Sequence, residues 1–239
     1  MSGLSEDTRR LLTQASTATL TTQLFKRGLR NAFIQGVRPL NPKAPRMVGP
    51  AFTLRYIPAR EDLDHMGVFD DYDHPQRRAI ETCPPGFVLV MDCRQNARVA
   101  SAGSILLTRL MVRGCAGLVS DGGLRDSPEI ARLDFPVYCA GPSAPTNLIL
   151  HHALDLNHPI GCGDVPVYPG DVLVGDGEGV VVIPRHLADE VAADAAEQDR
   201  LETFILEEVR GGRALRGVYP PDAGTRARYQ EWRKRQGGG

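Results

Sequence analysis

The stretch that decides the fold lies between residues 100 and 129. It begins ASAGSILL (residues 100–107) and ends GLVSDGGLRDSPE (residues 117–129). In the first segment, Gly103 directly precedes a helical pattern, so the first amides of that helix lack intrahelical partners and attract anions. In the second, an apolar strand runs into a glycine-containing loop that ends in Arg125 and Asp126. An arginine fork binds carboxylate or enolate oxygens, and an aspartate holds a hard metal ion. The stretch therefore predicts a site for a small, oxygen-rich, acidic molecule.

The segments around this stretch alternate between strand and helix patterns. Continuous apolar runs at Phe87–Asp92, Ala116–Ser120 and Pro136–Ala140 predict buried strands. Between the first two, Ser104–Arg113 has helical apolar spacing, and Gly114 suits a left-handed helix end. Strands and helices that follow one another in this order predict an α/β fold.

The N-terminal part extends this fold. Residues 5–30 have helical spacing, and the good N-capping residues in the middle predict two helices with a break near Ser16. Residues 31–50 are rich in proline and glycine, which is typical of an extended connector. Ala51–Ile57 alternates apolar and polar residues and predicts a strand.

The C-terminal part changes character twice. Valine-rich segments between residues 161 and 182, separated by turn signals, predict antiparallel strands. Pro184 then opens a long amphipathic helix that ends near Arg210. The arginine-rich tail from Gly211 to Gly239 is expected to be a solvated or oligomer-packing extension. We therefore expect one domain over residues 1–239, with a core at about 15–185 and a helix and tail at 186–239.

Bulk composition excludes several functional classes. The 239 residues are 42% hydrophobic and 24% charged with a net charge of −1, which gives no general attraction to nucleic acid or membrane. No apolar run approaches the ~20 residues of a membrane span. The polar first ten residues and the absence of CxxC spacing favour a cytoplasmic protein with reduced cysteines. The five cysteines are Cys83, Cys93, Cys115, Cys139 and Cys162.

An acidic segment with two histidines lies between Glu61 and His74. It offers carboxylate and imidazole groups, so a metal cluster is one interpretation. Its spacing matches no known ligand pattern, and a solvated loop or helix face is the interpretation that we favour.

Several blocks of the sequence together resemble the RraA-like family. The blocks are Gly49–Thr53, Pro84–Asp92, Gly103-x-x-Leu106, Gly117–Glu129 and Pro169–Val180, in this order. That family holds class II 4-hydroxy-4-methyl-2-oxoglutarate/4-carboxy-4-hydroxy-2-oxoadipate aldolases and a regulator of ribonuclease E activity. The resemblance implies a swivelling β/β/α domain, a homotrimer or a hexamer, and sites at subunit boundaries.

The resemblance also implies roles for individual residues. Gly103, Ser104, Ile105 and Leu106 would bind the substrate, with backbone amides near Ile105 and Leu106 on a pyruvate-type carboxylate. Arg125 would contact the keto oxygen and stabilise the enolate. The metal, Mg²⁺ or Mn²⁺, would be held by Asp126, with Glu129 as the following carboxylate. These roles predict a metal-dependent lyase for a 2-oxo acid, with Arg125 and Asp126 catalytic and oxaloacetate decarboxylation as a side activity.

Ser104 departs from the family pattern, because the aldolases usually have an acidic residue after this glycine. A serine cannot supply the charge that pairs with the arginine, so decarboxylation or a sugar-acid dehydration stays open beside aldol cleavage. A non-catalytic regulator that binds ribonuclease E is a further alternative, although the regulator lacks the aspartate of the Arg-Asp pair. Asp126 could also serve only as an N-cap of the following helix, and Asp121 could compensate for Ser104.

Overall fold

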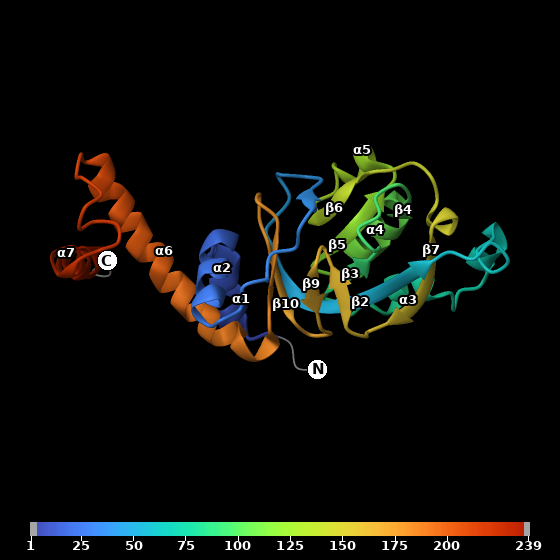
Figure 1. The fold of residues 1–239 in the computed structure, drawn as a ribbon, viewed down its shortest axis with the longest axis horizontal. Coiled ribbons are helices and arrows are strands. Elements are labelled where there is room, and N and C mark those ends of the chain that lie inside the picture. The colour runs from blue at the N-terminus through green and yellow to red at the C-terminus, as the bar shows by residue number, and fades with distance from the viewer. Residues whose placement is uncertain (1–3, 237–239) are drawn as a thin grey trace.

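The structure is a computed structural model that describes residues 4–236; residues 1–3 and 237–239, the last of them part of the arginine-rich tail, lie outside the described residues. Its centre is a curled nine-stranded mixed sheet, with helices packed on it and a long helical arm at the C-terminus (Figure 1). The strands are β1 (Arg38–Pro39), β2 (Met47–Pro58), β3 (Val88–Asp92), β4 (Ala100–Ala102), β5 (Gly117–Leu124), β6 (Val137–Pro142), β7 (His151–Leu156), β8 (Ile160–Cys162), β9 (Val165–Val167), β10 (Val172–Gly175) and β11 (Val180–Ile183). The helices are α1 (Glu6–Gln14), α2 (Thr17–Lys26), η1 (Met66–Asp70), α3 (Pro75–Thr82), α4 (Ser104–Val112), α5 (Ser127–Ile130), η2 (Asn147–Ile149), η3 (Arg185–Leu187), α6 (Ala188–Arg210) and α7 (Ala223–Gln236).

The sheet joins a parallel part to an antiparallel part through β2. Strands β2, β3, β5 and β6 pair in parallel, whereas β10, β11 and β7 run antiparallel to their neighbours. The first residues of β2 pair with β10 and its last residues with β7, with a register shift between Arg55 and Tyr56. This long strand curls the sheet, and the predicted α/β class and the antiparallel C-terminal strands are confirmed.

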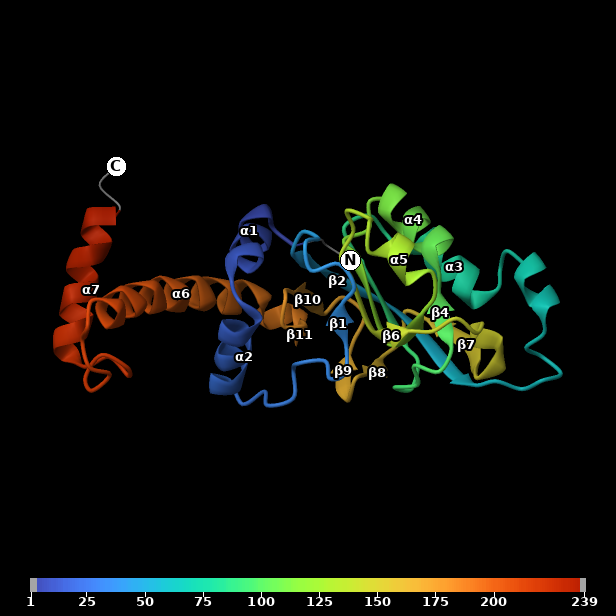
Figure 2. The same cartoon turned by 90° about the horizontal axis from the view of Figure 1, so that it is seen from above.

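Helices and a small hairpin bury both faces of the sheet. Helices α3 and α4 cover one face, where Leu107 and Leu110 of α4 are fully buried. The β8–β9 hairpin covers part of the other, and α1, α2 and the start of α6 pack on β10 and β11. Figure 2 shows α3, α4 and α5 together on one side of the sheet. Fully burying one such leucine side chain contributes about 1.5–3 kcal/mol.

Two expectations about local structure were wrong. The segment expected to be a connector already contains β1, and β2 begins at Met47. Gly122 and Gly123 were expected in a loop, yet β5 continues through both. A Cβ on Gly122 would lie 2.5 Å from the Cβ of Cys93, and one on Gly123 would lie 2.7 Å from the Cβ of Ser143. These glycines therefore allow neighbouring segments to pack closely against the strand, and they do not loosen it.

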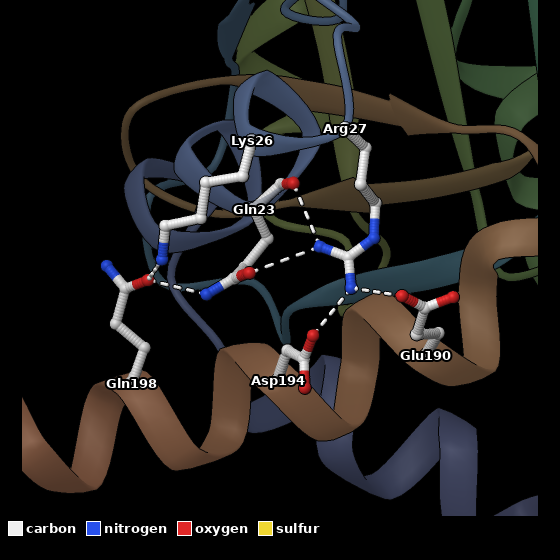
Figure 3. Close-up of polar contacts among 6 residues, drawn as sticks. All are labelled: Gln23, Lys26, Arg27, Glu190, Asp194 and Gln198. Atoms are coloured by element: carbon white, nitrogen blue, oxygen red, sulfur yellow. Dashed lines mark hydrogen bonds and ion pairs between the residues drawn. The ribbon is translucent and has the colours of Figure 1, made fainter.

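Polar contacts attach the first half of α6 to α2 (Figure 3). The Arg27 guanidinium donates to Glu190 at 2.7 Å and to Asp194 at 2.5 Å. One turn away, Gln23 donates to the side-chain oxygen of Gln198 at 2.6 Å. The Arg27 side chain is only 15% exposed, so these contacts fix where α6 leaves the body.

The second half of α6 extends away from the body and ends against α7 (Figures 1 and 2). A separate apolar cluster of Phe204, Ile205, Val218 and Tyr229 holds the two helices together. The predicted long helix after Pro184 is confirmed, and the tail contains a folded helix where an extension was expected. None of the helices in residues 4–236 is long and apolar enough to cross a membrane.

Candidate active site

Parallel pairing of β4 with β5 brings the two halves of the decisive stretch together. Strand β4 ends at Ala102, and the next residue, Gly103, is the N-cap of α4 and has an extended backbone with φ −137°. The amide of Arg125 donates to the carbonyl of Ala102 at 3.0 Å, which places the end of β5 beside the start of α4. The helix amides of Ile105 and Leu106 lack intrahelical partners, because they belong to the first turn.

Gly103 provides the space in which the Arg125 and Asp126 side chains lie. A Cβ at this position would be 2.6 Å from Oδ2 of Asp126 and 3.0 Å from Cγ of Arg125. The backbone here is one that any residue adopts, so the requirement for glycine is steric. Side-chain packing over Gly103 therefore determines where the guanidinium and the carboxylate sit.

Asp126 has a left-handed backbone conformation, with φ 55°. Its carbonyl accepts from the amides of Glu129 and Ile130, but its side chain makes no cap hydrogen bond to α5. Oδ2 instead accepts from the Ser104 amide at 3.1 Å and from the Ser104 hydroxyl at 3.2 Å. The interpretation of Asp126 as a side-chain N-cap is therefore wrong, and the carboxylate is turned towards the start of α4.

A cavity of about 270 Å³ lies beside this pair. Five of the predicted site residues line it: Gly103, Ile105, Leu106, Arg125 and Asp126. Its other walls come from η1, α3, β4 and the start of η2. The Nε of Arg125 lies 3.6 Å from Oδ2 of Asp126. The Arg125 side chain is half exposed, so its guanidinium can contact a bound ligand. The first turn of α4, a cation and a carboxylate thus share one cavity.

Two other predicted residues lie outside this lining. Ser104 does not line the cavity, but its hydroxyl donates a hydrogen bond to Asp126, which does. Glu129 is exposed on α5 and is not among the lining residues. The structure therefore groups Asp126 with Arg125 and does not bring a second predicted carboxylate into the cavity.

Asp121 lies in the middle of β5 and does not line this cavity. Its carboxylate is buried and accepts from the amides of Cys93 at 2.6 Å, and of Gln95 and Gly163 at 3.2 Å each. Burial raises the pKa of Asp121 to about 6, although these hydrogen bonds oppose the shift. Asp121 therefore joins three chain segments and does not replace the missing acid at position 104.

The acidic segment between Glu61 and His74 contributes lining residues that the sequence did not indicate. Met66 and Phe69 of η1 line the cavity, together with Arg77 of α3 and Asn147 of η2. Asp64 pairs with Nδ1 of His152 at 2.9 Å. In the described part of the chain, no three histidine, cysteine or acidic side chains are grouped as a metal site. The metal-cluster interpretation of this segment is therefore not supported.

Comparisons with known proteins agree on one family and fold. The family described as RraA-like (Aldolase/RraA) matches residues 17–182. A Halalkalibacterium halodurans protein named "Putative 4-hydroxy-4-methyl-2-oxoglutarate aldolase" is 32% identical over 74% of this chain and 80% of its own length. Streptomyces coelicolor RraAS2, described as an unusual member of the RNase ES inhibitor RraA protein family, is 28% identical over 85% of this chain and 98% of its own, with a TM-score of 0.74. A solved protein from Pseudomonas syringae pv. tomato, 24% identical over 92% of this chain and 100% of its own, has the same fold with a TM-score of 0.77.

Proposed function

The chain belongs to the RraA-like family, and from the geometry of its cavity we propose that it is a metal-dependent carbon–carbon lyase acting on a 2-oxo carboxylic acid. One observation carries the proposal: the first turn of α4, Arg125 and Asp126 line one small cavity. The names of relatives as 4-hydroxy-4-methyl-2-oxoglutarate aldolases support the same class of reaction.

The proposed binding mode follows from the charges around the cavity. The amides of Ile105 and Leu106 bind the substrate carboxylate at the positive end of α4. Arg125 then lies beside the keto oxygen, where negative charge develops as a carbon–carbon bond breaks to leave an enolate. A cation there stabilises the transition state more than the ground state, and removal of such a contact costs about 3–4 kcal/mol in barrier.

Asp126 is the residue that we propose for Mg²⁺ or Mn²⁺. Magnesium in proteins keeps several waters and uses one or two carboxylates together with substrate oxygens. Asp126 fits this pattern, since its side chain is 38% exposed and only Oδ2 is engaged, by Ser104 and by the Arg125 guanidinium. A bound ion would polarise the keto group and neutralise charge. Glu129 is exposed on α5 and would act on such an ion only through water.

Apolar residues near the cavity mouth support an oligomer. Ile105 is 80% exposed and Met66 is 69% exposed, and both line the cavity. A second copy of the chain packed over these side chains would remove them from water. We therefore propose a homotrimer or hexamer with the cavity at a subunit boundary, which light scattering on a gel-filtration column would measure.

Turnover by the purified chain tests the proposed function. With Mg²⁺ or Mn²⁺ present, we expect the chain to release pyruvate from 4-hydroxy-4-methyl-2-oxoglutarate or from oxaloacetate. A coupled lactate dehydrogenase assay would measure the pyruvate. Arg125→Ala is expected to abolish turnover with an unchanged circular dichroism spectrum. Arg98→Ala is the matched control, because Arg98 is exposed and outside the cavity lining. No pyruvate from either substrate would contradict the proposal.

Likeness to RraAS2 supports a second candidate, a regulator that binds a ribonuclease. The Arg125-Asp126 pair at the cavity favours catalysis, since protein binding does not need a metal ligand there. A pull-down with ribonuclease E separates the two: tight binding that Asp126→Ala leaves unchanged, without turnover, would favour the regulator.

A further inference from the structure

A second guanidinium, that of Arg77, lines the same cavity as Arg125. Arg77 is on α3 and lies over the Phe69 ring, with 4.5 Å between its Cζ and the ring centroid. The ring orients the guanidinium but supplies no full negative charge. Among residues 4–236, no carboxylate forms an ion pair with Arg77, whereas Arg60 and Arg109 each have one. Arg77 is therefore a cation that lines the cavity and is paired with no carboxylate of the described chain.

A buried amide next to it also lacks a partner. Asn147 is 3% exposed and lines the cavity from the start of η2. Its Oδ1 accepts from the Thr146 hydroxyl at 3.4 Å, but its Nδ2 has no hydrogen-bond partner within the described chain. A buried donor without a partner is destabilising, so such a group is expected to meet a ligand or a water.

We infer that Arg77 and Asn147 form a subsite for a second carboxylate of the substrate. This inference rests on the proposed function, because the α4 amides and Arg125 take the 2-oxo acid end. Arg77 supplies charge and a planar fork, and Asn147 supplies a neutral donor. Arg77 is thereby the residue that selects 2-oxo dicarboxylates, the class to which both proposed substrates belong, over 2-oxo monocarboxylates.

Binding of two matched ligands tests the inference without turnover. 2-Oxoglutarate differs from 2-oxobutanoate by one terminal carboxylate, and each would be titrated calorimetrically into the full chain with Mg²⁺. The wild type is expected to bind 2-oxoglutarate about 10- to 100-fold more tightly, the range of a charge-assisted hydrogen bond. Arg77→Gln should bring the ratio of the two Kd values close to one by weakening only 2-oxoglutarate.

Two further variants control for charge and for folding. Arg78→Gln removes the same charge from an exposed position one residue along α3, outside the cavity lining, and should leave the ratio unchanged. Arg77→Lys keeps the charge without the fork and should restore part of the preference. Asn147→Leu, which is close in size, should also lower the affinity for 2-oxoglutarate more than that for 2-oxobutanoate.

The two proposals fail in different ways. A wild type that prefers 2-oxoglutarate through Arg77 but turns over no 2-oxo acid would contradict the lyase and support the subsite. A wild type with turnover but equal Kd values for the two ligands would overturn the subsite. So would a preference that Arg77→Gln leaves intact.

Discussion

Substitution of Gly103 by alanine tests the geometry of the site with one methyl group. The new Cβ would lie 2.6 Å from Oδ2 of Asp126, and ordinary contacts begin at 3.4 Å. The carboxylate must therefore move by about 0.8 Å, and the Arg125 side chain must also shift. Misplacement of a catalytic group by about 1 Å can lower the rate about 100-fold. We expect kcat/KM for pyruvate release to fall about 10- to 100-fold, or about 1.4–2.7 kcal/mol in barrier.

The same substitution should hardly affect folding. Gly103 has an extended backbone, so alanine at this position adds no backbone strain. Alanine also lowers the conformational entropy of the unfolded chain, which favours folding by about 0.4–1 kcal/mol. The groups that must give way are half-exposed side chains rather than backbone. Urea unfolding should therefore show a free energy of unfolding within about 1 kcal/mol of the wild type.

Gly141→Ala is the matched control. It makes the same chemical change in β6, where a Cβ would meet no heavy atom within 4 Å. Its kcat/KM and stability should match those of the wild type. The reasoning is refuted if Gly103→Ala keeps wild-type kcat/KM, or if it loses activity only by unfolding.

The remaining predictions concern metal binding, the Ser104 contact, the arm and pH. Asp126→Asn should abolish the Mg²⁺ binding heat seen by calorimetry while keeping the fold; unchanged binding would remove Asp126 as the ligand. Ser104→Ala removes one of the two hydrogen bonds to Asp126, so kcat/KM should fall about 5-fold, by ~1 kcal/mol. Arg27→Ala should lower the free energy of unfolding by about 1 kcal/mol, less at high salt, with activity unchanged. Burial raises the pKa of Asp121 from 3.8 to about 6, so the folded state binds the extra proton between these values and the contribution of this group to stability falls as pH rises from 4 to 6. Asp121→Asn should therefore be less destabilising at pH 7.5 than at pH 4.5, by about 2 kcal/mol in urea unfolding, and an equal effect at both would contradict this.

Local patterns made α1, α2, α4 and α6 predictable, together with the position of the candidate site at the start of α4. Gly103 before a helical stripe and Arg125-Asp126 after an apolar strand are each readable within about ten residues. Their meeting depends on parallel pairing of β4 with β5, and the sequence did not predict β4 as a strand. Ser16 likewise marked the start of α2, where its hydroxyl accepts from the Thr19 amide at 3.0 Å.

Features that depend on distant segments were not predictable. Gly122 and Gly123 resemble loop residues until Cys93 and Ser143 are seen against them. Asp121 binds amides from residues that are 26 to 42 positions away. Arg77 and Asn147 belong to no motif, and only the fold brings them to the cavity of Arg125. An unpaired cation or amide cannot be identified from sequence, because its pairing is a property of the folded chain.

The serine at position 104 affects which of two reactions, aldol cleavage or decarboxylation, the cavity of a single chain can support. Its hydroxyl donates to Asp126, so the contact is favourable, whereas a carboxylate at this distance would repel Asp126 and raise the pKa of one of the two. Asp126 is thereby the one carboxylate among the described residues that line the cavity. Aldol cleavage needs a base for the proton of the substrate hydroxyl, and a metal-bound Asp126 is a poor one. Decarboxylation of a 2-oxo acid whose second carboxylate is on C3, such as oxaloacetate, needs no such base: CO2 leaves, Arg125 stabilises the enolate oxygen, and the enolate takes a proton from water. The aldolase reaction therefore requires a base from water or from a neighbouring copy at the exposed mouth, whereas decarboxylation requires only the groups that this chain already brings together.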